Sequence, residues 1–232
     1  DMLQLIGLIL ISWFLIWLFT KGNLNVLGLT PTIERMKYFI LLFIVTGIIS
    51  ASAFFLRMLY AQEEYALAPS LNLSSILIEI WHQFRTVLTE ELICRGAILY
   101  ILIKKTGNTK AIIITSVFFA ILHWINSGVW GNLTQMAIVF TFTFAMGLLL
   151  AFSYAKTFSV LIPFAIHFGW NLTQNYIFPD TATGNHVFVL ASTPPEITIS
   201  YLAFFTMLLL PKISVLLINY LIIKTNRQVE MP

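Results

Sequence analysis

The sequence of 232 residues has one cysteine, Cys94, and few charged residues. A single cysteine excludes an internal disulfide and a zinc site built from several cysteines. Any metal would therefore need histidine and carboxylate ligands. Charged residues make up only 10% of the chain, too few to cover the surface of a soluble globule. The basic residues are scattered singly between apolar runs, which argues against a nucleic-acid partner.

Apolar residues take the place of the missing charge. The chain is 59% hydrophobic, with 20 phenylalanines and a mean hydropathy of +0.88. Such a chain has lipid as its main solvent, so the composition predicts a multi-pass integral membrane protein. The first apolar run, residues 2–20, has neither a basic stretch before it nor a cleavage site of small residues. We therefore interpret it as a retained span and not as a signal peptide.

Seven segments are long enough, or nearly so, to cross a membrane, which takes roughly 20 apolar residues in a helix. They are residues 2–20, 36–56, 73–103, 111–125, 131–154, 158–178 and 197–223. The connections are rich in Gly, Pro, Asn and Ser or Thr. The sequence shows no internal repeat and no soluble domain. It predicts an all-α fold: a polytopic transmembrane helical bundle of about seven spans, with residues 1–232 as a single membrane domain.

Basic residues near span ends set the expected orientation, because Lys and Arg are retained in the cytoplasm. They gather at alternate connections, at Lys21, Arg35, Lys37, Lys104, Lys105, Lys110, Lys156, Lys224 and Arg227. The other side has Glu63, Glu64, Asp180 and Glu196, with Arg57. This pattern predicts an odd number of crossings in the cell membrane, with the C-terminus in the cytoplasm.

Polar residues interrupt three of the apolar segments. They are Glu90, Glu91, Arg95, His123, His167 and Asn171. Counting from the nearest lysines at 1.5 Å per residue places four of these positions, Glu91, His123, His167 and Asn171, about 16 to 23 Å from the cytoplasmic boundary, close to mid-membrane. Ionisable groups inside a membrane cost roughly 2.5 to 3.5 kcal/mol each on insertion scales. Each residue alone is explained by packing, but the set at one depth favours a functional site.

The spacing within the helices supports convergence of these side chains. Glu91 and Arg95 are four residues apart and share a helix face, so the arginine can neutralise this carboxylate. Glu90 points about 100° away and can contact a different partner. His167 and Asn171 are also four residues apart. One glutamate can therefore be structural while the other reacts.

Three short motifs occur in this part of the chain. They are two glutamates with an arginine four residues after the second, a phenylalanine four residues before a histidine, and a histidine four residues before an asparagine. The residues concerned are Glu90, Glu91, Arg95, Phe119, His123, His167 and Asn171. In this order the motifs resemble those of the CPBP family of intramembrane proteases, also called the Abi or CAAX-protease family. The resemblance covers roughly residues 80–178.

The resemblance implies an endopeptidase that cleaves a membrane-associated or prenylated protein or peptide. Glu90 and His123 would activate a water molecule, and a buried glutamate is a suitable general base for that step. His167 and Asn171 would stabilise the oxyanion of the tetrahedral intermediate. No Ser–His or Cys–His pair at matching depth indicates a covalent nucleophile.

Glu91 and Arg95 would shape the site and balance its charge. The role of a metal stays open, because Glu90, His123 and His167 could also form a three-ligand site for a divalent ion such as zinc. Two other functions are alternatives: an ion-coupled membrane transporter, which also uses intramembrane Glu, His and Arg, and a catalytically inactive membrane scaffold. Membrane lipid is a partner in every case, and the substrate is not identified by the sequence.

Overall fold

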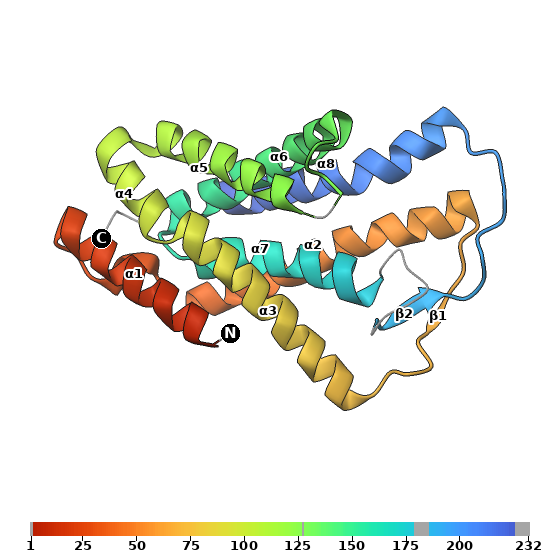
Figure 1. The fold of residues 1–232 in the computed structure, drawn as a ribbon, viewed down its shortest axis with the longest axis horizontal. Coiled ribbons are helices and arrows are strands. Elements are labelled where there is room, and N and C mark those ends of the chain that lie inside the picture. Colours follow the sequence, from red (N-terminus) through yellow and green to blue (C-terminus); the bar gives the residue numbers. More distant parts are fainter. Residues whose placement is uncertain (1, 127, 179–185, 226–232) are drawn as a thin grey trace.

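The computed structural model describes residues 2–126, 128–178 and 186–225. Its α-helices in these ranges are α1 (Met2–Thr20), α2 (Ile33–Ala61), α3 (Leu73–Arg95), α4 (Ala97–Thr106), α5 (Asn108–Leu122), α6 (Leu133–Thr157), α7 (Leu161–Leu172) and α8 (Tyr201–Thr225). The short turn η1 (Leu24–Leu27) lies between α1 and α2, and the turns η2 (His123–Ile125) and η3 (Thr173–Ile177) directly follow α5 and α7. Two strands, β1 (Tyr65–Leu67) and β2 (Phe188–Leu190), form one antiparallel pair. The predicted all-α helical membrane bundle is confirmed (Figure 1).

The bundle is elongated, and its two ends differ (Figure 1). The end of α8 and the α4–α5 connection lie at one end, and β1 with β2 lies at the other. The last turns of α4, α6 and α8 carry Lys104, Lys105, Lys156 and Lys224. We call this the basic end. Asp180 and Arg227, which contributed to the predicted orientation, lie outside the described residues, and the cytoplasmic placement of the basic end stays a prediction.

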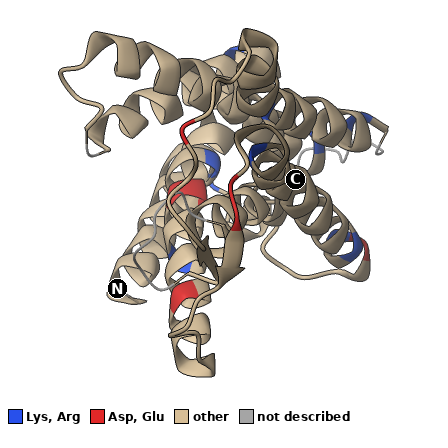
Figure 2. Cartoon of the chain, turned by 90° about the vertical axis from the view of Figure 1, so that its right-hand side faces the viewer, with Lys and Arg blue, Asp and Glu red and all other residues tan. Residues whose placement is uncertain are grey.

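Five helices of the described chain are long and apolar enough to cross a membrane. They are α1, α2, α5 with η2, α6 and α8. Two predicted segments differ from this set. Helix α3 has five charged residues in its sequence, and α7 has only 12 residues before it continues into the π turn η3. Helix α2 has four charged residues, all near its ends, and the other helices have at most two each. Figure 2 shows the charges of α3 spread along the helix.

The prediction of one continuous span over residues 73–103 was wrong. Helix α3 ends at Arg95, and α4 begins at Ala97 after Gly96, whose ψ of −130° is not helical. A side chain at Gly96 would collide with the carbonyl oxygen of Leu92. The break redirects the chain toward the basic end, and it leaves the polar residues in the last turns of α3.

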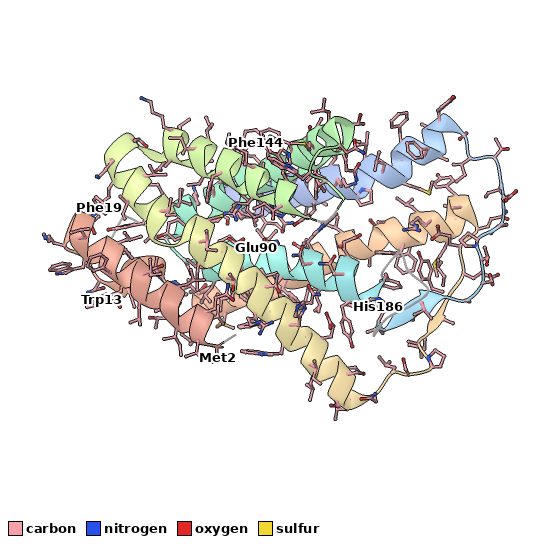
Figure 3. The ribbon with its side chains drawn as sticks, in the orientation of Figure 1. Met2, Trp13, Phe19, Glu90, Phe144 and His186 are labelled. Atoms are coloured by element: carbon pink, nitrogen blue, oxygen red, sulfur yellow. The ribbon has the colours of Figure 1, made fainter. Side chains whose placement is uncertain are left out.

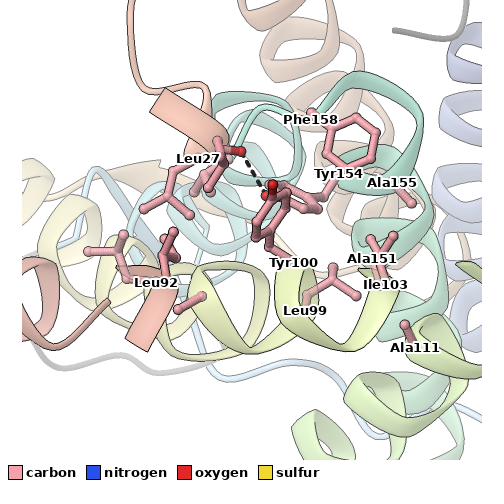
Figure 4. Packing of buried hydrophobic residues seen from close by; sticks show 14 of the residues in the cluster. Leu27, Leu92, Leu99, Tyr100, Ile103, Ala111, Ala151, Tyr154, Ala155 and Phe158 are labelled. Atoms are coloured by element: carbon pink, nitrogen blue, oxygen red, sulfur yellow. Dashed lines mark hydrogen bonds between the residues drawn. The ribbon is translucent and has the colours of Figure 1, made fainter. Parts of the chain in front are cut away.

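The connection between α1 and α2 is anchored to the α6–α7 corner at the basic end. The hydroxyl of Tyr154 donates a hydrogen bond to the carbonyl of Val26 at 2.9 Å (Figure 4). Ser159 Oγ donates to the carbonyl of Gly28 at 2.7 Å, and Leu27 is fully buried between these contacts. These bonds hold the corner from which α7 begins.

Helix α7 is the central element of the bundle. It packs against α2, α3 and α6, and nine of its twelve residues are buried. Phe164 and Phe168 stack on each other with ring centroids 5.3 Å apart, and the ring of Phe84 from α3 meets both edge to face. This aromatic contact fixes α3 against α7, the two helices that carry most of the candidate residues.

Candidate active site

Glu91 is the centre of a buried polar cluster between α3 and α7. Its Oε1 accepts a hydrogen bond from Arg95 Nη1 at 3.1 Å, and His167 Nδ1 lies 2.7 Å from the same oxygen. The side chains of Glu91 and Arg95 are fully buried, and that of His167 is 5% exposed. A buried carboxylate needs such partners to offset its desolvation. The structure thus contains the Glu91–Arg95 pair expected from their spacing and adds His167 to it.

His167 is oriented by this contact. Because the Glu91 carboxylate can only accept, we assign a proton to Nδ1 of the imidazole. The other ring nitrogen, Nε2, lies 3.6 Å from Glu90 Oε2. The ring of His167 therefore lies between the two adjacent glutamates, with one nitrogen directed to each.

His123 is oriented by its own helix. Its Nδ1 lies 2.8 Å from the carbonyl oxygen of Phe119, so this nitrogen carries a proton and Nε2 keeps its lone pair. The ring of Phe119 contacts both imidazoles edge to face, with centroids 4.4 Å from His123 and 5.8 Å from His167. The Arg95 guanidinium lies 4.0 Å from the same ring centroid. Phe119 is thus an apolar wall between the three polar groups.

Glu90 faces a cavity of about 500 Å³. This cavity is called the catalytic cavity after the role proposed for it below, and the residues around it are Thr86, Glu90, Ile93, Cys94, Phe119, Leu122, His123, Ile125, Asn126, Asn171 and Asn175. The Glu90 side chain is 32% exposed, and Figure 3 shows this residue midway along α3, beside α7. The structure therefore brings Glu90, His123 and Asn171 to one cavity. Glu91 and Arg95 are not among the residues around it and lie behind its wall.

Three polar residues of this cavity were missed by the sequence analysis. Thr86 lies one helical turn before Glu90, and Asn175 lies one turn after Asn171, so the four-residue spacing already used for the motifs could have found both. Asn126 follows η2 and carries no such signal. All three add hydrogen-bonding groups to a cavity that would otherwise be mostly apolar.

The candidate residues do not form a three-ligand metal site in this arrangement. Within the described ranges, no three His, Cys, Asp or Glu side chains come close enough together to hold an ion. Glu90, His123 and His167 are thus not gathered around a common point. We therefore derive no step of the chemistry through a metal.

Comparison with known families agrees with the geometry. The family model described as type II CAAX prenyl endopeptidase Rce1-like matches residues 72–173, from the start of α3 to the end of α7. The resemblance predicted from the three motifs is confirmed. This Rce1-like region contains all six candidate residues, and the match supports a protease, a hydrolase, within the membrane. In the comparisons with curated proteins and with solved structures, nothing matches the chain.

Proposed function

We propose that this protein is an intramembrane endopeptidase that hydrolyses a peptide bond of a prenylated or otherwise membrane-associated protein. The observation that carries the proposal is the shared cavity of Glu90, His123 and Asn171, with His167 directed to Glu90 from behind. The cavity brings together Glu90 as a base, His123 as a second hydrogen-bond partner for the attacking water, and the side-chain amide of Asn171 as a donor. These are the groups that hydrolysis by an activated water requires.

In the proposed reaction, a water molecule binds between Glu90 and the lone pair of His123 Nε2. Glu90 takes a proton from this water as its oxygen attacks the peptide carbonyl. The carbon–nitrogen bond then breaks, and Glu90 returns the proton to the leaving amine, so the products are a carboxylic acid and an amine. General bases of this kind contribute about 10²- to 10⁴-fold in rate.

The negative charge that develops on the carbonyl oxygen needs donors. Asn171 supplies its side-chain amide from the cavity wall, and His167 supplies Nε2–H when both of its ring nitrogens carry protons. The carboxylate of Glu91 balances the charge of that imidazolium through Nδ1. A donor to an oxyanion is worth about 10²- to 10³-fold in rate. Because Glu91 does not line the cavity but contacts His167, it would act on the reaction only through His167.

The decisive experiment compares three purified variants in proteoliposomes with a farnesylated reporter peptide and mass spectrometric detection of products. We expect Glu90→Gln and His123→Ala to keep wild-type circular dichroism but to lose cleavage by at least about 100-fold. Glu79→Gln is the matched control, because Glu79 lies on the same helix and is absent from the cavity lining. Wild-type cleavage by either active-site variant would disprove the assignment.

The same preparations separate the two alternatives. An ion-coupled transporter would take up solute or protons in the proteoliposomes without peptide cleavage, and a scaffold would bind the peptide without either activity. To find the natural substrate, we would compare peptides that accumulate in cells with the Glu90→Gln variant against cells with the wild type. Peptides that span a cleavage site and accumulate only with the variant would identify the substrate.

A further inference from the structure

A second cavity, of about 510 Å³, lies between α5, α6 and α8. Its lining includes Ala145, Leu149, Phe152, Ile213, Leu217 and Tyr220, and the Tyr220 hydroxyl is the one polar side-chain group among its lining residues. We call it the α6–α8 groove. It shares no lining residue with the catalytic cavity. The groove is therefore a separate feature of the described chain, and the proposed reaction does not use it.

The groove opens on the outside of the bundle. Ile213 is 55% exposed, Leu217 53% and Tyr220 39%. In a membrane protein such side chains face lipid. A hydrocarbon chain that enters an apolar groove makes dispersion contacts with the groove walls. A flexible hydrocarbon chain fits this shape and chemistry.

One end of the groove lies close to the basic end of the bundle. The rings of Phe152 and Tyr220 lie 5.3 Å apart and join α6 to α8. Lys156 follows Phe152 by four residues on α6, and Lys224 follows Tyr220 by four residues on α8, so each lysine lies on the groove side of its helix. Lys224 Nζ lies 5.8 Å from the ring centroid of Tyr220. Two cations thus lie one turn beyond an apolar groove.

We propose that the α6–α8 groove binds an anionic phospholipid. One acyl chain lies between α6 and α8, and the phosphate binds Lys156 and Lys224 with the Tyr220 hydroxyl as a further donor. Basic residues between transmembrane helices at the cytoplasmic interface recognise anionic head groups. An acyl chain with a negative head group matches both parts of this surface.

The position of the groove distinguishes this lipid from the prenyl group of a substrate. A prenyl group attached near the scissile bond would lie beside Glu90 and His123. The catalytic cavity is formed by α3, α5, α7 and their adjoining turns, and α6 and α8 contribute no residue to it. A lipid in the groove is therefore a structural or regulatory ligand and not part of the substrate.

The test is native mass spectrometry of the full chain in detergent, titrated with phosphatidylglycerol or phosphatidylcholine. We expect the wild type to retain one phosphatidylglycerol in preference to phosphatidylcholine. The double variant Lys156→Gln/Lys224→Gln should lose phosphatidylglycerol affinity about 10- to 30-fold. Lys104→Gln/Lys105→Gln is the matched control, because these lysines lie at the same end on α4 and contact Tyr100 and Phe19 instead. This control should keep wild-type affinity.

A second variant, Ala145→Phe, fills the groove and should abolish retention of both lipids. If it fails to fold, Ile213→Trp at the exposed rim takes its place. Equal phosphatidylglycerol affinity in the Lys156→Gln/Lys224→Gln variant and the wild type would overturn the proposal. So would displacement of the lipid by a farnesylated peptide, which would make the groove a substrate site, or a dimer that only Ala145→Phe dissociates, which would make it a subunit interface.

Discussion

The imidazole of His167 joins the two adjacent glutamates of α3. Its Nδ1 lies 2.7 Å from Glu91 Oε1, and its Nε2 lies 3.6 Å from Glu90 Oε2. Glu91 is fully buried and also binds Arg95, whereas Glu90 is partly exposed in the catalytic cavity. One ring thus lies between a buried, paired carboxylate and a carboxylate that is exposed to the cavity, and this geometry supports the proposed division of roles.

The variant Glu91→Gln tests this division. It leaves the buried Arg95 without a negative partner, and breaking a buried ion pair in this way costs about 3–5 kcal/mol. We expect a clearly lower melting temperature in detergent. We also expect kcat to fall about 10-fold or more, within the 10²- to 10³-fold that one oxyanion donor is worth, with little change in KM. The Gln amide oxygen can still accept from His167 Nδ1, but it no longer supplies the negative charge that balances the imidazolium.

Glu34→Gln is the control for the stability part. Glu34 pairs with Lys37 at 2.9 Å, but these side chains are 73% and 66% exposed. An exposed pair of this kind contributes about 0–1 kcal/mol, so its loss should barely change the melting temperature. Equal melting temperatures for the two variants would show that the buried pair does not stabilise the bundle.

The sequence predicted those features of the site that depend on spacing along one helix. Glu91 and Arg95 share a face because they are four residues apart, and the structure pairs them. Convergence of α3, α5 and α7 was predicted from equal depth, because membrane spans run roughly parallel. The contact of His167 with Glu91 was not predicted, since it depends on the rotation of α7 against α3, which is set by packing in three dimensions.

The third predicted span shows a different limit. Its apolar residues continue past position 95, and hydropathy alone cannot separate one long helix from two helices joined at an angle. The break depends on the backbone of Gly96, which approaches the Leu92 carbonyl too closely for any side chain. An isolated glycine in an apolar run is a weak signal, since glycine is common inside membrane helices.

Gly28 offers a test of the anchored α1–α2 connection. Its φ is +58°, and a side chain there would collide with the carbonyl oxygen of Phe158. We expect Gly28→Ala to lower the free energy of unfolding by about 2 kcal/mol or more, because strain and the collision add. The measurement is thermal or denaturant unfolding in detergent.

The variant Gly107→Ala shows strain without a collision. Gly107 also has a positive φ, +80°, but a side chain there would meet no atom within 4 Å. Its alanine variant should therefore show backbone strain alone, of about 1–3 kcal/mol, because a ψ of 165° lies in a region that residues with a side chain avoid. If Gly28→Ala kept the stability of the wild type, close contact with Phe158 would not be what anchors this connection.

Metal dependence is the next prediction. Because no three-ligand group is present among the described residues, we expect the purified enzyme to contain less than one equivalent of zinc and to retain cleavage after dialysis against EDTA. Elemental analysis and the farnesylated reporter peptide measure both. One equivalent of zinc in the wild type that disappears in His123→Ala would show instead that Glu90, His123 and His167 rearrange around an ion.

The last prediction concerns the end of the bundle opposite the lysines. Tyr65 in β1 donates a hydrogen bond to Glu63 Oε2 at 2.7 Å, and Arg57 holds the same carboxylate with contacts of 2.7 and 2.8 Å. Burial raises the pKa of Tyr65 above its ordinary value of 10.0, and the hydrogen bond to Glu63 raises it further. The folded state therefore favours the neutral phenol.

Since the pKa is higher in the folded than in the unfolded chain, the contribution of Tyr65 to stability is complete below about pH 10. It is lost as the pH rises from there toward the folded-state pKa. We expect Tyr65→Phe to cost about 1 kcal/mol at pH 8, and to lose less stability than the wild type between pH 9 and 11. Tyr60→Phe, at a position 40% exposed on α2, is the control that keeps the wild-type slope. Parallel melting curves for the wild type and Tyr65→Phe across that range would show that the Tyr65 phenol does not stabilise this end of the molecule.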